Sequence, residues 1–237
     1  MPSGLVEINK DKEVKFKGYV TAPANGVYPG VLLLHQEYGI DANIRTIAEL
    51  FAAKGHTVFV PDLFWRELPG CELNSNKKED LEEAKKLILN YNIEKGYKDV
   101  VSCLQWLRET PQCNGLITTI GYGVGANLSY LSGLWLDIES TVCYDFEGND
   151  FFQEHDTFVR RPMLIHLCKN IYQDLIAKDK IKFLENINNI NLNIYEGCQR
   201  SFTRISSDNF NEEETLIAQK KTFEHILAAF KKPHTHA

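Results

Sequence analysis

The segment Gly121-Tyr122-Gly123-Val124-Gly125-Ala126, near the middle of the chain, has residue types and spacing that could serve chemistry. It follows a β-branched stretch, 116–120, and opens a stretch of helical periodicity, so we expect it at a strand-to-helix turn. One interpretation is a nucleophile elbow of the G-x-S-x-G type, with Gly123 at the nucleophile's position. The other is a dinucleotide fingerprint formed by Gly121, Gly123 and Ala126, which would indicate an NAD(P)-dependent oxidoreductase.

The residues around this segment leave both interpretations open. Asp145 and Glu147 follow the next predicted strand, about 20 residues further on, where an acid that binds the ribose is expected in dinucleotide-binding proteins. However, the dinucleotide motif normally opens the first βαβ unit of a domain, and here several predicted elements precede it. Asp145 and Glu147 could also be a displaced pair of catalytic acids, but the favoured interpretation is that they are simply loop residues after a strand.

Candidate site residues follow the predicted strands, because ligands of open α/β sheets bind beyond the carboxyl ends of the strands. The segments at these positions are 35–39, 61–64, 121–126, 168–171 and 196–202. Two of them contain cysteines, Cys168 and Cys198, and a third contains His35, so a thiol–imidazole pair could form a relocated nucleophile. The favoured interpretation is unrelated thiols near a pocket, because most free cysteines are structural.

The elements that must position these segments alternate between short apolar strands and helices. The predicted strands are 14–20, 31–34, 57–60, 116–120, 141–144, 163–167 and 192–195, and the predicted helices are 43–54, 77–90, 95–108, 125–134, 177–187 and 212–232. This alternation predicts an α/β fold with a mostly parallel sheet and helices on both faces. Because the chain has 237 residues and lacks an internal repeat or a clear linker, we expect a single domain, 1–237.

Composition and charge exclude several functional classes. The net charge of −6 argues against nucleic acid as a partner, because phosphate binding needs a basic face. The longest apolar run, 31–34, is too short for a membrane span, and no basic region followed by an apolar stretch marks a secretory signal. We therefore expect a cytoplasmic protein with six reduced cysteines and no membrane partner. The histidines show no metal-ligand spacing, and we expect neither a metal nor a cofactor.

Several ordered motifs resemble those of the dienelactone hydrolase family, in the α/β-hydrolase superfamily. They are Gln36-Glu37-Tyr38-Gly39, Pro61-Asp62-Leu63-Phe64, Pro69-Gly70, the segment 121–126, Tyr195-Glu196, Ser201-Phe202 and Arg204. The resemblance covers nearly the whole chain and implies an α/β-hydrolase fold. It also implies hydrolysis of esters or lactones, in which an elbow cysteine attacks the carbonyl, a histidine accepts its proton and an aspartate orients the histidine.

The same resemblance implies that this chain has lost all three catalytic side chains. The nucleophile's position is Gly123, that of the aspartate is Ile171 and that of the histidine is Arg200. Glycine cannot form an acyl-enzyme and isoleucine cannot orient an imidazole. Arginine stays protonated at neutral pH and is therefore no general base.

The resemblance also implies that a ligand-binding site survives. Glu37 matches the glutamate that holds the resting thiol in the family, and Arg204 matches the arginine that binds the substrate carboxylate. The backbone N–H groups of Val124 and of a residue near Tyr38 would form the oxyanion hole. We also expect Glu37 to pair with Arg200, because a buried glutamate without a partner is costly.

The sequence therefore predicts a pseudo-hydrolase that binds a small carboxylate, an ester or lactone, or a protein partner. An active hydrolase of esters or lactones with a relocated cysteine, Cys168 or Cys198, is the alternative within the same family.

Overall fold

The computed structural model describes residues 3–11, 14–147, 159, 161–177, 184–185 and 187–231. The chain divides into two compact units, residues 1–118 and 119–237. The boundary lies inside strand β5 (Cys113–Tyr122), so its last residues belong to the second unit. The expectation of a single domain stays a prediction.

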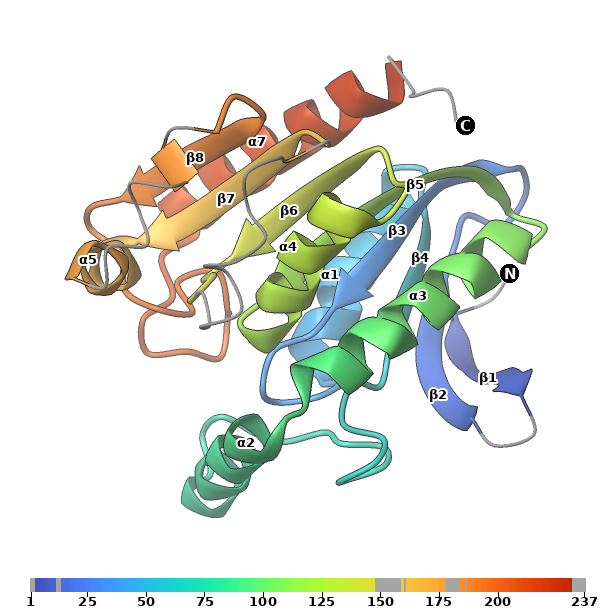
Figure 1. The fold of residues 1–237 in the computed structure, drawn as a ribbon. Helices are drawn as coiled ribbons and strands as arrows, with labels where there is room; N and C mark the ends of the chain where they lie inside the picture. Colours follow the sequence, from blue (N-terminus) through green and yellow to red (C-terminus); the bar gives the residue numbers. More distant parts are fainter. Residues whose placement is uncertain are drawn as a thin grey trace. The chain divides into compact units, whose positions relative to one another are not determined.

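The first unit pairs four strands in the order β1-β2-β4-β3 (Figure 1). Its elements are β1 (Gly4–Asp11), β2 (Val14–Thr21), β3 (Tyr28–Leu34), α1 (Ala42–Ala53), β4 (Thr57–Pro61), α2 (Lys78–Asn90) and α3 (Ile93–Glu109). Strands β3 and β4 run parallel, whereas β1 and β2 add antiparallel pairs at the edge. Val31 to Leu34 of β3 are fully buried, as expected for a strand covered on both faces.

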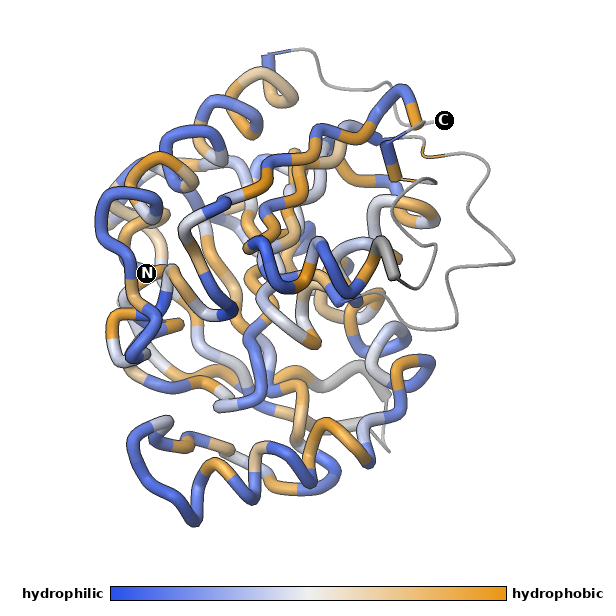
Figure 2. Tube along the Cα trace, turned by 90° about the vertical axis from the view of Figure 1, so that its left-hand side faces the viewer, coloured by the Kyte–Doolittle hydropathy of each residue, from blue (hydrophilic) through white to orange (hydrophobic). Residues whose placement is uncertain are grey.

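The second unit pairs β6, β7 and β8 in parallel. Its remaining elements are α4 (Val124–Trp135), β6 (Ser140–Tyr144), β7 (Met163–Cys168), α5 (Lys169–Ala177), β8 (Ile190–Tyr195) and α7 (Glu212–Lys231). In Figure 1, α4 lies in front of these strands and α7 behind them. Helix α4 is almost entirely buried because it is apolar on nearly all sides. Helix α7 contains both hydrophobic and hydrophilic residues along its length. Figure 2 shows the same mixture of residue types along the helices of this chain.

The predicted α/β alternation is confirmed, with two elements missed. Strand β1 has few buried apolar residues because it lies at the edge; Leu5 is 67% exposed, and Ile8 is buried. No helix was predicted at 168–171, but α5 begins at Lys169, directly after β7. The residue before the helix is Cys168, which is not one of the residue types that usually signal a helix start. The predicted helix 177–187 falls mostly outside the described residues.

In the described part of the chain, no helix combines the length and the apolar character needed to cross a bilayer. All six cysteines are free thiols, and all are buried.

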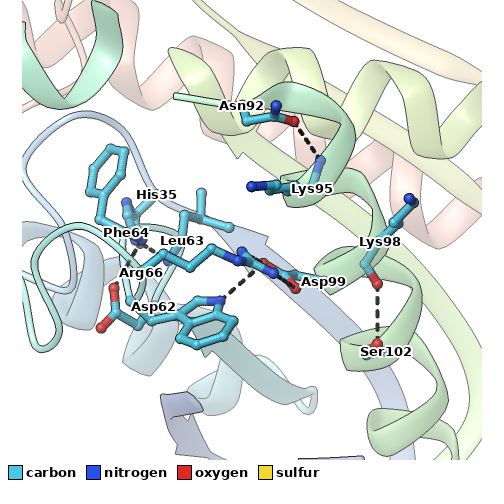
Figure 3. Close-up of polar contacts among 11 residues, drawn as sticks. His35, Asp62, Leu63, Phe64, Arg66, Asn92, Lys95, Lys98, Asp99 and Ser102 are labelled. Atoms are coloured by element: carbon cyan, nitrogen blue, oxygen red, sulfur yellow. Dashed lines mark hydrogen bonds and ion pairs between the residues drawn. The ribbon is translucent and has the colours of Figure 1, made fainter. Parts of the chain in front are cut away.

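A buried carboxylate fastens α3 to the loop that follows β4 (Figure 3). Asp99 of α3 is 5% exposed and accepts hydrogen bonds from Trp65 Nε1 at 3.0 Å and from Arg66 Nη2 at 2.9 Å. The Arg66 guanidinium also lies 4.2 Å from the centre of the Trp65 ring, which stacks on Phe16. One carboxylate thereby orders both side chains.

Replacement of Asp99 by alanine should lower the free energy of unfolding by about 2 kcal/mol, because it removes the buried carboxylate that accepts hydrogen bonds from Trp65 and from the partly exposed Arg66 guanidinium. Urea denaturation followed by circular dichroism measures this loss. The matched control is Glu82→Ala, which removes an exposed carboxylate paired with Lys85 and should change the unfolding free energy far less, because solvent screens this pair. Equal losses in the two variants would show that the Asp99 contacts add no net stability.

Candidate active site

The segment 121–126 folds as a sharp turn between β5 and α4. Strand β5 ends at Tyr122 and α4 begins at Val124, which leaves Gly123 alone to reverse the chain direction. Gly123 adopts φ 54° and ψ −117°, a conformation that side chains rarely tolerate. A Cβ on Gly121 would lie 2.0 Å from the carbonyl oxygen of Gly125, so this close approach requires glycine. These are the features of a nucleophile elbow.

Strand β6 holds the elbow in place. The Gly123 N–H donates to the carbonyl oxygen of Tyr144 at 3.0 Å, at the carboxyl end of β6. The Gly123 carbonyl oxygen accepts from the N–H of Ala126 at 2.9 Å, which closes the first turn of α4. Val124, the predicted oxyanion donor, is the first residue of α4 and is buried. The backbone of the elbow is thus fully formed around a residue without a side chain.

Asp145 and Ser201 join the end of β6 to the loop after β8. Among the described residues, these are the two non-glycine residues with positive φ, 54° for Asp145 and 63° for Ser201. The Ser201 N–H donates to Oδ2 of Asp145 at 2.7 Å, and the Asp145 N–H donates to the carbonyl oxygen of His166 in β7 at 3.1 Å. Strained backbone of this kind persists where surrounding contacts over-determine it, often at functional sites. Asp145 therefore shapes the loop that carries Arg200.

Arg200 forms an ion pair with Glu147, the second acid after β6. Both side chains are about two-fifths exposed, 41% for Arg200 and 42% for Glu147, so solvent screens the pair. Asn209 Nδ2 donates to the Arg200 carbonyl oxygen at 3.1 Å and helps to fix the loop. Sequence analysis assigned the partner of Arg200 to Glu37 instead. A contact with Glu37 would join the two units and stays a prediction.

Ile171 and the two candidate cysteines lie at the carboxyl ends of β7 and β8. Ile171 is in the first turn of α5 and is 7% exposed. Cys168 ends β7 and pairs in register with Tyr195, and Cys198 follows β8. Burial is the main cause that raises the pKa of each thiol to about 11. Because the thiolate is the nucleophile, neither cysteine is activated at neutral pH.

A polar network that sequence analysis missed lies beneath this end of the second unit. His166, in the middle of β7, is fully buried, and its ring is hydrogen-bonded to the Tyr195 hydroxyl at 2.8 Å and to Thr222 Oγ1 at 3.0 Å. Thr222 Oγ1 in turn lies 2.7 Å from the Tyr144 hydroxyl. The one sequence signal was a lone histidine in the apolar strand MLIHLC. The network links β6, β7, β8 and α7.

The family-like motifs of the first unit build two structured turns. Gly39 has φ 76°, and a Cβ there would lie 2.0 Å from the Cys71 carbonyl oxygen, so the turn that carries Glu37 and Tyr38 needs this glycine. The Tyr38 carbonyl oxygen accepts from the Leu73 N–H at 2.9 Å. Glu37 is partly buried in this turn, and Tyr38 is 9% exposed. The oxyanion hole expected from the N–H groups of Val124 and of a residue near Tyr38 would involve both units and stays a prediction.

His35 and Asp62 hold the second turn (Figure 3). The Leu63 N–H donates to His35 Nε2 at 3.0 Å, and His35 Nδ1 donates to the Gln36 carbonyl oxygen at 2.7 Å. Asp62 accepts from the N–H groups of Phe64 at 3.1 Å and Gly70 at 2.7 Å. Burial lowers the pKa of His35 to about 4 and raises that of Asp62 to about 6. With both ring nitrogens engaged by the backbone, His35 is poorly suited to activate a thiol.

Arg204, the predicted carboxylate-binding residue, is 4% exposed in the loop after β8. The backbone N–H of Arg204 donates to the Ser201 carbonyl oxygen at 3.0 Å, so Arg204 belongs to the same loop turn as Arg200. Within the described residues, no group of three or more His, Cys, Asp or Glu side chains could hold a metal ion.

Comparison with known proteins decides the family. The model of the dienelactone hydrolase family matches residues 16–233. The chain belongs to the dienelactone hydrolase family. Its curated relatives include carboxymethylenebutenolidase 1 of Cupriavidus pinatubonensis, 28% identical over 98% of this chain and 100% of that protein. Carboxymethylenebutenolidase of a Pseudomonas species is 26% identical over 89% of each chain.

Solved structures show the same fold. A structure from Klebsiella pneumoniae assigned to the dienelactone hydrolases matches with a TM-score of 0.81, covers 95% of this chain and 98% of that chain, and is 15% identical. Dienelactone hydrolase from Anabaena variabilis matches with a TM-score of 0.69 over 96% of this chain and 97% of that chain, at 18% identity. The α/β-hydrolase fold is therefore confirmed. Membership of a hydrolase family also favours the elbow over the dinucleotide fingerprint.

The buried histidines make stability depend on pH. Burial lowers the pKa of His166 to about 3 and that of His35 to about 4, from an ordinary value of 6.5. As the pH falls below 6.5, the unfolded chain takes up protons that the native chain cannot, which costs about 1.4 kcal/mol per pH unit for each histidine. Asp62 acts in the opposite direction from its raised pKa of about 6 down to its ordinary 3.8.

Exchange of His166 for asparagine should therefore flatten the pH dependence of the unfolding free energy. The unfolding free energies of wild type and His166→Asn should approach each other by about 1.4 kcal/mol per pH unit as the pH falls from 6 to 4. Above pH 7 the difference should stay constant, which provides an internal control. Urea titrations at each pH measure it, and parallel curves for the two proteins throughout this range would contradict a neutral, buried His166.

Proposed function

We propose that this chain is a non-hydrolytic member of its family, which uses the retained elbow to bind a small organic carboxylate or a lactone without turnover. The observation that carries this proposal is Gly123 at the apex of a formed elbow. An elbow positions the side chain of its central residue above the helix N-terminus, and this residue has no side chain to attack a carbonyl. The chain thus keeps the backbone scaffold of the hydrolase site but lacks the nucleophile that hydrolysis needs.

The two other family positions support the same conclusion. Ile171 is a buried apolar side chain on α5, and it cannot accept a hydrogen bond from an imidazole. Arg200 forms an ion pair with Glu147. A guanidinium offers several N–H donors and no acceptor, so it suits recognition of an anion rather than removal of a proton. Arg204, on the same loop turn, offers a second guanidinium.

The backbone of the elbow supplies the remaining donor. The first N–H groups of a helix have no partner within the helix and favour negative charge, and Val124 begins α4 at the turn. In the family mechanism such donors stabilise an oxyanion, and a carboxylate oxygen carries the same charge. A ligand with a carboxylate, or a lactone carbonyl, therefore fits the chemistry that the site retains.

Hydrolysis by the wild-type protein tests the proposal directly. We expect turnover of an aryl ester and of a dienelactone no faster than with an inert control protein, with or without iodoacetamide. Turnover abolished by iodoacetamide would instead point to Cys168 or Cys198 as the nucleophile and would overturn the proposal. Single exchanges, Cys168→Ala and Cys198→Ala, would then assign it.

Restoring the family's side chains tests whether the scaffold itself is intact. The triple variant Gly123→Cys, Ile171→Asp, Arg200→His should gain ester hydrolysis that iodoacetamide abolishes. The matched control is Gly123→Ala, Ile171→Asp, Arg200→His, which carries the same backbone strain at position 123, about 1–3 kcal/mol, but no thiol. Equal activity in the two triple variants would show that these positions are not those of the triad.

Ligand binding separates the pseudo-hydrolase from the oxidoreductase. Benzoate should raise the thermal midpoint in a concentration-dependent way, whereas benzamide, of similar shape without the charge, should not. Arg204→Gln should weaken benzoate binding by about tenfold, because a charge-assisted contact contributes about 1.5 kcal/mol or more. A midpoint raised by NAD(P) and not by any small carboxylate would favour the dinucleotide interpretation instead.

A further inference from the structure

Helix α7 presents a stripe of exposed side chains that the active site does not use. Its members follow one another at alternating spacings of four and three residues, the pattern that faces a neighbouring helix. They are Glu213, Ile217, Lys220, Glu224, Leu227 and Lys231, and each is exposed. Ile217 is 39% and Leu227 55% exposed, and Leu216, at the side of the stripe, is 60% exposed.

The other side of α7 is fixed to the strands of its own unit. Thr215, Ala218, Thr222, Ile226 and Ala229 are buried, and α7 packs against β6 and β7. Thr222 Oγ1 is hydrogen-bonded to the Tyr144 hydroxyl and to the His166 ring. These contacts determine the rotation of α7 about its axis, so the exposed stripe cannot turn inward to bury Ile217 or Leu227.

The stripe is self-complementary about residue 222. Positions equally distant from 222 carry opposite charges or two apolar side chains: Glu213 corresponds to Lys231, Lys220 to Glu224, and Ile217 to Leu227. Leu216 likewise corresponds to Ala228, which is also exposed. A two-fold axis that passes beside residue 222 of two antiparallel helices would bring every one of these pairs together.

We propose that α7 is a homodimer interface in which two copies pair their helices antiparallel about residue 222. Each two-fold interface is isologous, so one patch must match itself, and this stripe does so in both charge and apolarity. A parallel pairing would place Glu213 against Glu213 and Lys231 against Lys231, which is repulsive. The antiparallel arrangement also sets the acidic first turn of one helix, residues 212–214, beside Lys231 in the last turn of the other.

The charged side chains of the stripe are available for such contacts. Lys220 and Glu224 lie 4.0 Å apart within one helix, with side chains 78% and 65% exposed, so they can turn to a partner at little cost. With few apolar residues per copy, we expect a dimer that dissociates on dilution, because small interfaces with little apolar burial are typical of transient association.

Sedimentation velocity of the full chain across a range of concentrations tests the proposal. Wild type should shift from monomer to dimer as concentration rises. Lys220→Glu places a glutamate opposite Glu224 twice in each dimer and should raise the dissociation constant by about tenfold or more. The double variant Lys220→Glu, Glu224→Lys exchanges the two charges and should restore dimerisation. Leu227→Glu should abolish it.

Two controls keep the outcome specific to this stripe. Lys85→Glu reverses an exposed charge on α2, and Leu89→Glu replaces a side chain that is 84% exposed on the same helix; neither should alter the dissociation constant. Circular dichroism checks that every variant folds. A wild type that stays monomeric at all concentrations would overturn the proposal. So would a dimer that is unaffected by Leu227→Glu, or a charge-exchanged double variant as weak as Lys220→Glu.

Discussion

The second unit depends on the packing and hydrogen bonds of one residue, Tyr144. Its ring stacks between Tyr122, with ring centres 4.6 Å apart, and His166, at 4.4 Å. Its carbonyl oxygen accepts the Gly123 N–H, and its hydroxyl is hydrogen-bonded to Thr222. The end of β6 thereby fixes the elbow on one side and the rotation of α7 on the other. Because Tyr144 is fully buried, these contacts are not exchanged for water.

This arrangement explains why the elbow keeps its backbone geometry without a nucleophile. The turn is set by close backbone approach at Gly121 and by the hydrogen bond to β6, neither of which needs a side chain at position 123. A residue with a side chain at position 123 would be strained by the positive φ, whereas glycine adopts this conformation without strain. The Asp145–Ser201 hydrogen bond likewise shapes the loop of Arg200 without a histidine in it. On the proposed function, the geometry of the site is retained because it is built into the core.

The motifs shared with the dienelactone hydrolases in the first unit have local structural duties. The Asp62 carboxylate accepts hydrogen bonds from two backbone N–H groups, and His35 accepts one from the Leu63 N–H. Gly39 allows the chain to pass close to the Cys71 carbonyl oxygen. Such residues indicate the fold whether or not the chain hydrolyses anything. Membership of the family therefore constrains the scaffold more strongly than the activity, and the activity has to be argued from the site.

The sequence by itself determined the order of strands and helices, the elbow and its glycine apex. These follow from periodicity, from glycine spacing and from ordered motifs, all of which are local. Strand β1 and helix α5 were not predicted, because an edge strand buries few residues and α5 begins without a capping side chain. Tertiary structure alone decided the partners of buried polar groups: Glu147 for Arg200, Ser201 for Asp145, and Tyr195 and Thr222 for His166. Those pairs lie tens of residues apart, and hydrogen-bond partners at such separations are set by strand register and loop geometry, which the residue pattern of one element does not contain.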